Sequence, residues 1–268
     1  MKENNTYIIT TGWWSTEDDV DDRTIKSGDS KIRSKEFHQL WYDVVQGYTS
    51  AQKIYVIDSD ASVKPTLDKK DEVLISLLEN AGHSTHHTGK LCGVSRAHLL
   101  GMSLAMVNEV DYWVYVEQDA LIYGDGIIEK CIEQMKKSYM FGYGLGTPQP
   151  VQQSLMIVKK EAIPKFINNF NKIKAKDSEI APETKFAIAA SAILMCIPER
   201  IYIKMEDNTK FGNILKRIVW KLIKTFRGFD YLPVGYGRVR PIDFTDTHFY
   251  FQHGNKEELD TFIEKHNQ

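Results

Sequence analysis

Apolar residues recur along the chain with two spacings, one typical of strands and the other of helices. Short runs rich in β-branched and aromatic residues predict buried strands at Tyr7–Thr11, Lys53–Ile57, Trp113–Val116 and Ser154–Val158. Apolar residues three and four positions apart predict helices at Ser34–Tyr48, Glu72–Asn80, Gly93–Glu109, Ile127–Lys137, Glu161–Phe170 and Thr184–Leu194. A further strand is predicted at Ile201–Lys204. This alternation predicts βαβ units, and hence an α/β fold with a mostly parallel central sheet flanked by helices.

Two segments between these elements are predicted as loops. Ser15–Lys31 is rich in Asp, Ser and Thr, and His83–Lys90 is polar and carries three histidines. Tyr139–Gly146 is aromatic and glycine-rich, but its glycines lack the strand-then-helix context of a dinucleotide-binding loop. We therefore give that passage no functional weight.

The composition is that of an ordinary globular protein, with 268 residues of which 42% are hydrophobic. The net charge of −2 gives no global basic field, so we expect no nucleic-acid partner. Cys92, Cys131 and Cys196 are odd in number and widely separated, which predicts buried thiols in a reducing compartment rather than a disulfide framework or a zinc site. Without a leader pattern or an apolar run of about 18 residues, we expect a cytoplasmic protein.

Two of the predicted strands end in pairs of acidic residues, Asp58 with Asp60 and Glu117 with Asp119. The carboxyl ends of parallel strands lie at one edge of a sheet, where ligands bind in open α/β folds. Paired carboxylates at that edge suit a divalent cation that bridges to phosphate, or hydrogen bonds to a base or ribose. Acids at strand ends also occur as solvated caps, so both interpretations stay open at this point.

Arg96 and His98 lie near the start of the predicted helix Gly93–Glu109. The N-terminus of a helix attracts anions, because its first backbone N–H groups have no partner within the helix. Arg96 therefore either meets an anionic ligand or forms a surface salt bridge.

The segment Phe211–Phe229, with Lys210 before it, carries six basic residues and no acidic one. Its apolar residues follow helical spacing, which predicts a cationic amphipathic helix that includes Trp220. Such a helix can lie in the headgroup region of an anionic membrane. The alternative is a core-packed helix with a basic solvent face. We favour the membrane because this segment has no acidic residue although the chain is acidic overall.

The order of these motifs resembles the nucleotide-sugar-binding half of the GT-A fold glycosyltransferases, over roughly residues 6–200. The likeness rests on IDSDAS after the second strand, GVSRAHLLGMSLAM in a later helix, and DYWVYVEQDALIYGDG around the second acidic pair. In that family a strand-end acid contacts the nucleotide and a D-x-D motif carries the metal. Here the motif reads Glu117-Gln118-Asp119, so Asp119 is the safer ligand.

The resemblance implies a Rossmann-like GT-A core over residues 1–205 and a C-terminal extension over residues 206–268, packed on the same domain. It implies Mn²⁺ or Mg²⁺ bound by Glu117, Asp119 and His253, with His248 in reserve. Both histidines lie in a tail where aromatic residues surround Arg238 and Arg240. The residues that the resemblance assigns to the nucleotide-sugar donor are Thr11, Trp13, Asp58, Asp60, Arg96 and Gln118.

For an inverting enzyme of this family the resemblance implies an acidic general base after the acceptor-side strand. Glu183 in APETKF is that candidate, with Glu179 and Asp177 behind it. The acidic pair usual at this position is missing, so retention of configuration stays an alternative. Asp119 is the second catalytic candidate, through the metal.

The resulting expectation is a metal-dependent glycosyltransferase that moves a sugar from a nucleotide-diphosphate donor to a saccharide or lipid-linked saccharide in surface glycan synthesis. Its location would be cytoplasmic, peripheral at the inner face of the cell membrane through Phe211–Phe229. One alternative is a non-catalytic GT-A-like module that binds a nucleotide or glycan. Another is a sugar nucleotidyltransferase, although TTGWWSTEDD lacks the glycine-rich basic signature of that class.

Overall fold

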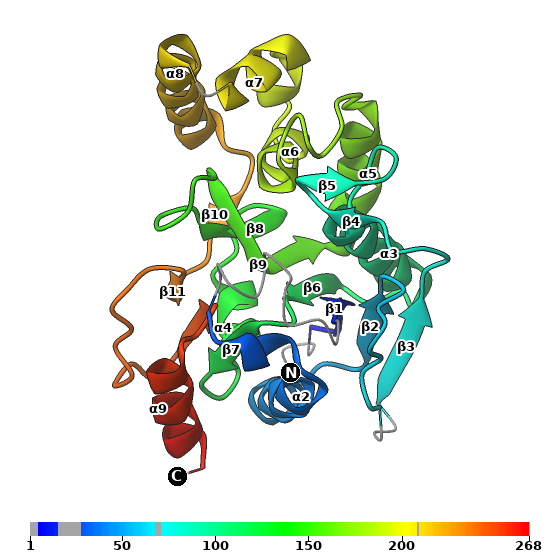
Figure 1. Ribbon diagram of the computed structural model, residues 1–268, viewed down its shortest axis with the longest axis vertical. Coiled ribbons are helices and arrows are strands. Elements are labelled where there is room, and N and C mark those ends of the chain that lie inside the picture. The colour runs from blue at the N-terminus through cyan, green and yellow to red at the C-terminus, as the bar shows by residue number, and fades with distance from the viewer. Residues whose placement is uncertain (1–4, 16–27, 68–70, 208, 268) are drawn as a thin grey trace.

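The computed structural model describes residues 5–15, 28–67, 71–207 and 209–267, and within them a seven-stranded sheet runs through the centre of the molecule (Figure 1). From one edge to the other its strands are β10 (Asp230–Tyr231), β8 (Tyr139–Tyr143), β9 (Val151–Lys159), β6 (Tyr112–Val116), β1 (Tyr7–Trp13), β2 (Ile54–Asp58) and β3 (Glu72–Ser76). Neighbouring strands are parallel, except that β9 runs antiparallel to β6 and β8. The predicted α/β class with a mostly parallel sheet is confirmed.

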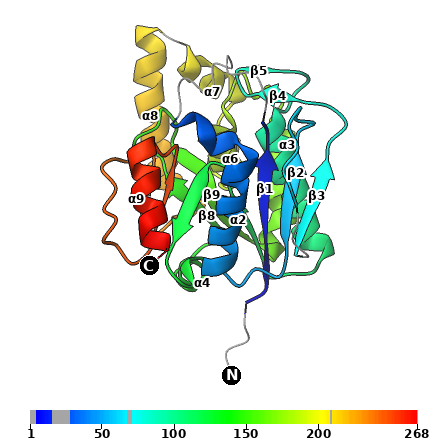
Figure 2. The same ribbon diagram turned by 60° about the horizontal axis from the view of Figure 1, so that its bottom comes forward.

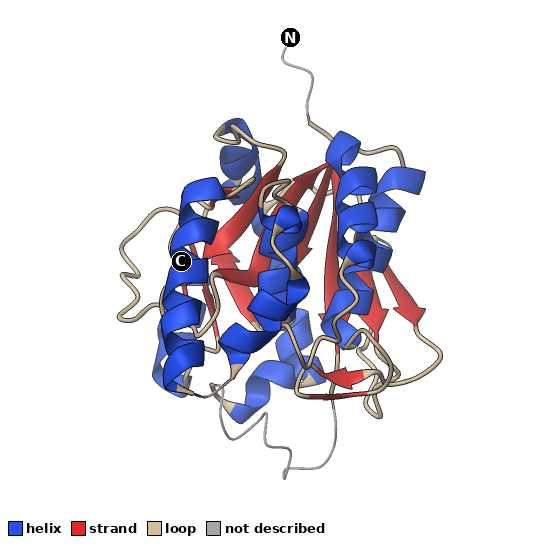
Figure 3. Cartoon of the chain, turned by 90° about the horizontal axis from the view of Figure 1, so that it is seen from above, coloured by secondary structure: helices blue, strands red, loops and turns tan. Residues whose placement is uncertain are grey.

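Helices cover both faces of this sheet (Figure 3). One face is covered by α2 (Lys35–Tyr48), α4 (Ile127–Glu133) and α9 (Lys256–His266). The other face is covered by α3 (Gly93–Val107), α5 (Ile163–Lys172) and α6 (Pro182–Ala189). Two further helices, α7 (Glu199–Glu206) and α8 (Lys210–Phe226), pack against each other beyond α6 (Figure 1).

The alternation of side chains along β6 explains why two helical layers are needed. Trp113 and Tyr115 point into the core shared with α3, α5 and α6, whereas Val114 and Val116 point into the core shared with α2 and α4. All four side chains are at most 1% exposed. A strand that is apolar on both faces is stable only with a helical layer on each.

Two smaller sheets lie at the carboxyl-end edge of the central one. β7 (Ala120–Tyr123) continues the chain after β6 and pairs antiparallel with β12 (Phe249–Gln252), which in turn pairs with β11 (Tyr236–Gly237). β4 (Gly82–His83) and β5 (His86–His87) form a hairpin. Except for Gly82, its residues lie in the predicted loop His83–Lys90.

The predicted helix Glu72–Asn80 is wrong, because Glu72–Ser76 forms the edge strand β3 beside β2. Two of the residues that completed the helical spacing, Leu77 and Leu78, lie beyond the strand, and Leu78 is fully exposed. Hydrogen bonding to a strand distant in sequence therefore outweighs a local pattern that fits a helix equally well.

The predicted strand Ile201–Lys204 is also wrong, since it lies within α7. Tyr202 and Met205, three positions apart, are the residues that α7 buries, which is helical spacing. The predicted helix Thr184–Leu194 begins earlier, with Pro182 at its first position, and ends at Ala189. Proline favours that first position because its missing N–H would be unpaired there in any case.

Other predictions are confirmed only in part. Cys92 and Cys131 are buried as predicted, whereas Cys196 is exposed. Most of the predicted loop Ser15–Lys31, residues 16–27, lies outside the described residues. In the described part of the chain, no helix is long and apolar enough to cross a membrane.

Candidate active site

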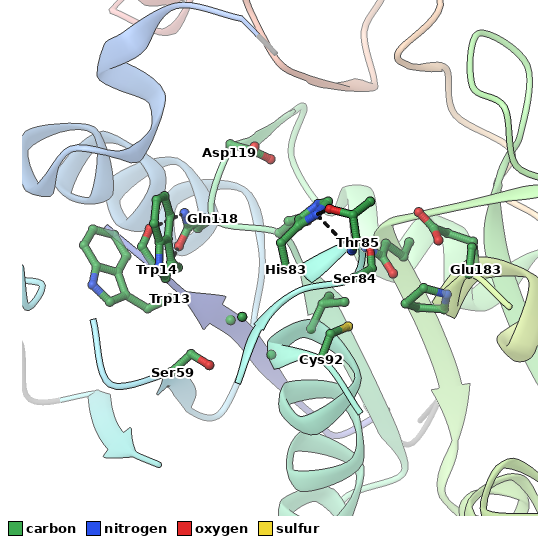
Figure 4. A pocket seen from close by; sticks show the side chains of 18 of the residues that line it. Trp13, Trp14, Ser59, His83, Ser84, Thr85, Cys92, Gln118, Asp119 and Glu183 are labelled. Carbon is green, nitrogen blue, oxygen red and sulfur yellow. Dashed lines mark hydrogen bonds between the residues drawn. The ribbon is translucent and has the colours of Figure 1, made fainter. Parts of the chain in front are cut away.

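A cavity of about 420 Å³ opens at the edge of the sheet where β1, β2 and β6 end (Figure 4). The end of β1, the turn after β6, the hairpin β4–β5, and the first turns of α3 and α6 all line it. In Figure 4, Trp13 and Trp14 lie at one end of the cavity and Glu183 at the other, with Asp119 between them. This is the edge at which the acids at the strand ends predict a ligand.

The turn from Glu117 to Ala120 carries the acidic motif and is held rigidly. The N–H of Ala120 donates to the carbonyl of Glu117 (2.9 Å), and the indole of Trp41 donates to the same carbonyl (3.1 Å). Gln118 accepts a hydrogen bond from the N–H of Trp14 (2.6 Å) and donates one to its carbonyl (2.8 Å). The middle residue of the motif thus fastens the turn to the end of β1.

The pairing of β7 with β12 brings the C-terminal tail onto this turn. Gln252 lies opposite Ala120 in the register, and the N–H of His253 donates to the carbonyl of Asp119 (3.3 Å). The Gln252 amide donates to Glu117 Oε2 (2.7 Å) and to Asp119 Oδ1 (2.9 Å). Gln252 therefore bridges the two carboxylates, a contact that sequence spacing alone does not indicate.

Three cationic or basic side chains surround the same carboxylates. Arg33 Nη2 lies 2.8 Å from Asp119 Oδ2, and His253 Nε2 lies 3.3 Å from that oxygen. Arg238 donates from Nε to Gln252 Oε1 (3.0 Å) and lines the cavity. In the sequence Arg238 stands among the aromatic residues of the tail without a predicted role, and no local pattern marks Arg33.

These surroundings separate the two acids electrostatically. Burial, together with the charge of Asp119, raises the pKa of Glu117 to about 8. Burial alone would raise the pKa of Asp119 too, but His253 and Arg33 outweigh it and hold that pKa well below its usual range. Asp119 is therefore the acid of the pair that ionises more readily, and Glu117 the one that holds a proton more readily.

Glu183 lies in the first turn of α6 and lines the far end of the cavity. Burial raises its pKa, while backbone hydrogen bonding at the helix start and the charge of Arg238 act in the opposite direction. A carboxyl group with a raised pKa in a cavity is typical of a general acid or base.

The alternatives to Glu183 are engaged elsewhere. Asp177 is buried and paired with the ammonium of Lys185 at 2.7 Å, and it also accepts from the N–H of Cys92 (2.8 Å). Glu179 accepts a hydrogen bond from the N–H of Lys176 (2.6 Å). Glu183 is the one of the three that lines this cavity.

Four of the residues assigned to the donor do not line the cavity: Thr11, Asp58, Asp60 and Arg96. Asp58 is fully buried and accepts hydrogen bonds from Ala61 N, Lys64 Nζ and Ser76 Oγ. Arg96 pairs with Glu79 at 3.0 Å, which is the salt bridge that the sequence left as its alternative. Trp13 and Gln118 do line the cavity; contact of all six residues with a nucleotide stays a prediction.

The donor types around Asp119 suit a divalent cation, since Mn²⁺ and Mg²⁺ prefer carboxylate oxygen and Mn²⁺ also accepts imidazole. The side chains of Asp119 and His253 already face each other. Arg33 and Gln252 hold the Asp119 oxygens, however, and no three His, Cys, Asp or Glu side chains of the described residues form a ready metal cluster. The residues fit the ion in chemistry, provided that Arg33 moves off Asp119.

No family model and no curated protein matches the chain. Among solved structures it is similar to a glycosyltransferase involved in the glycosylation of the major capsid of PBCV-1, at 12% identity and a TM-score of 0.37. The match covers 68% of this chain and 73% of that one. A TM-score this low carries no functional argument, so a functional assignment depends on the site itself.

Proposed function

We propose that this protein is a glycosyltransferase that takes a nucleotide-diphosphate sugar as donor and a saccharide or lipid-linked saccharide as acceptor, in surface glycan synthesis. The observation that supports this most is the grouping around Asp119: an ionised carboxylate, a histidine and two arginines at the carboxyl edge of the sheet. A second carboxyl group, Glu183, lines the same cavity at its other end.

Each group has a role in transfer. Arg33 and Arg238 provide positive charge where the diphosphate of the donor leaves, which stabilises the departing anion. Trp14 lines the end of the cavity where the nucleotide base would stack, next to the buried Trp13. Ionised Glu183 takes the proton from the acceptor hydroxyl as the new glycosidic bond forms, as an inverting reaction requires.

The proposal includes a divalent metal ion, Mn²⁺ or Mg²⁺, at Asp119 and His253, with Glu117 joining once it loses its proton. When bound, such an ion neutralises charge on the diphosphate. Chelation with EDTA is then expected to abolish transfer, and added Mn²⁺ to restore it. Transfer that persists unchanged in EDTA would leave the arginines as the cations of this site.

The test of the function is turnover with a panel of nucleotide sugars and Mn²⁺, measured as transfer and as slow hydrolysis of the donor. Asp119→Ala is expected to lose both activities. Asp43→Asn is the control, because Asp43 is an exposed acid of α2 outside the cavity, and it is expected to keep wild-type rates. A wild-type rate in Asp119→Ala would refute the assignment of this site.

The panel also separates the alternatives. A rise in melting temperature with a nucleotide diphosphate, but no turnover of any donor, would favour the non-catalytic binding module. Formation of a nucleotide sugar from a nucleoside triphosphate and a sugar phosphate would favour the nucleotidyltransferase.

A further inference from the structure

Helix α8 buries one side and leaves apolar residues on the other. Val219 and Ile223 are at most 1% exposed and join the core shared with α6. Gly212 approaches the α7–α8 turn so closely that a Cβ would lie 2.1 Å from the carbonyl of Asp207. The helix is therefore fixed to the molecule by this side.

Three large apolar residues point away from the core. Phe211, Ile214 and Ile218 are 62%, 57% and 52% exposed, and we call them the α8 stripe. At about 100° per residue they fall within about 60° of one another around the helix. Packing against this chain does not explain them, because the core side of α8 is formed by other residues.

A row of cations runs beside the α8 stripe. Lys210, Arg217 and Lys221 are exposed and lie within about 40° of one another, next to Ile214. Among the described residues none of the three forms an ion pair, whereas Lys216 pairs with Glu206. The segment from Lys210 to Phe229 has no acidic residue.

We infer that α8 is a docking surface for an anionic lipid bilayer, with the α8 stripe among the acyl chains and Lys210, Arg217 and Lys221 at the lipid phosphates. A helix that presents apolar and cationic rows together matches the interface between chains and headgroups. A second copy of this chain fits less well, since an antiparallel two-fold contact through the α8 stripe would set the cationic rows against each other. α8 also lies at the margin of the molecule (Figures 1 and 2).

α8 contacts segments that lead to the cavity, so the proposed docking surface is connected to the candidate active site. The ammonium of Lys224 lies 5.3 Å from the ring of Tyr143 at the end of β8, and the loop that follows supplies Pro148 and Gln149 to the cavity. Ser191, after α6, donates to the carbonyl of Phe226 (2.7 Å). If the proposed function holds, a lipid-linked acceptor therefore enters from the Glu183 end; bilayer binding itself does not depend on that function.

The test is co-sedimentation of the full chain with vesicles of phosphatidylcholine alone or mixed with phosphatidylglycerol. Binding is expected to the mixed vesicles only, and to weaken at about 1 M salt, where the Debye length is about 3 Å. Phe211→Ser/Ile214→Ser/Ile218→Ser and Lys210→Gln/Arg217→Gln/Lys221→Gln are each expected to bind at least about tenfold more weakly. Because the substituted side chains are exposed, circular dichroism and melting temperature should match wild type.

Two control variants test whether the loss of vesicle binding is specific to the residues of α8. Leu78→Ser/Val107→Ser removes two exposed apolar side chains elsewhere, and Lys35→Gln/Lys165→Gln/Lys172→Gln removes three exposed cations outside α8. Both are expected to bind like wild type. Absence of binding to the mixed vesicles, an equal loss in the controls, or a dimer in light scattering that the α8 stripe variant abolishes would each overturn the inference.

Discussion

Two aspartates at the carboxyl ends of β2 and β6, the strands that flank β1, have different surroundings. The carboxylate of Asp58 accepts hydrogen bonds from Ala61, Lys64 and Ser76, and it does not line the cavity. The carboxylate of Asp119 lines the cavity and is held by groups that come from distant parts of the chain. Chemical type and position at a strand end are therefore insufficient to define a ligand; the partners of the carboxylate decide.

Glu183→Gln tests the base. We expect the transfer rate to fall about 10²- to 10⁴-fold, because the amide does not accept the proton of the acceptor. The melting-temperature shift given by a nucleotide diphosphate should persist. Glu179→Gln, an exposed glutamate of the preceding loop, is the control and should keep the wild-type rate.

The pH dependence of the wild-type enzyme provides a second readout of the same residue. Because burial raises the pKa of Glu183, the rate should rise with pH through a midpoint above 4.5, as Glu183 loses its proton. If the residual rate of Glu183→Gln rises with pH through the same midpoint, the group that titrates there is not Glu183.

Gln252→Leu tests the bridge between the two acids. The change removes one hydrogen bond from each of Glu117, Asp119 and Arg238, so we expect the free energy of unfolding to fall by about 1–3 kcal/mol. Urea denaturation measures the loss. Gln39→Leu, which removes an exposed side-chain contact to Asp43, should stay within about 0.5 kcal/mol of wild type.

At the scale of elements, the cavity depends on segments that are fixed to one another by a few buried contacts. The loop before α6 is held by the ion pair of Asp177 with Lys185, and through Asp177 by the N–H of Cys92 at the start of α3. Both charged side chains are at most 1% exposed. This pair fixes the first turn of α6, and hence Glu183, against α3.

Lys185→Met is expected to lower the free energy of unfolding by about 3–5 kcal/mol, because it leaves the Asp177 carboxylate buried without its counter-ion. The double variant Asp177→Asn/Lys185→Met should regain part of that loss, since it removes the unpaired charge. Urea titration of the three proteins gives both values. A single-variant loss below about 1 kcal/mol would contradict the role assigned to the pair.

At the scale of the whole molecule, stability depends on one neutral histidine in the core. His98 is fully buried, its ring lies 3.9 Å from that of Tyr115 and 4.8 Å from that of Phe186, and burial lowers its pKa to about 4. Folding therefore requires the uncharged ring, whereas the unfolded chain binds a proton at the ordinary pKa near 6.5.

The contribution of His98 to the free energy of unfolding should consequently be greatest above pH 6.5, and it should decrease as the pH drops from 6.5 to 4. We expect a decrease of about 3 kcal/mol attributable to His98, and a comparison of wild type with His98→Phe in urea titrations at several pH values measures it. Subtraction removes the contribution of carboxyl groups that titrate in the same range. Parallel pH profiles for the two proteins would contradict this account.

The sequence by itself determined the strands β1, β2, β6 and β9 of the central sheet, most of the helices that cover it, and the acidic turn with Glu117 and Asp119. Alternation along β6 requires a buried strand, and the position of Glu117 and Asp119 after it fixes the edge at which they lie. These features are local, because they follow from the periodicity of a strand or helix. Where two periods fit equally well, as in β3, the same reasoning failed.

Only the tertiary structure decided which residues meet at that edge. Gln252 reaches the acids because β12 pairs with β7, and Arg33 because the turn before α2 lies above Asp119. It likewise decided that Asp58 is turned inward and that the α8 stripe is exposed. Contacts between residues up to 135 positions apart are set by packing and strand pairing, which no local pattern encodes.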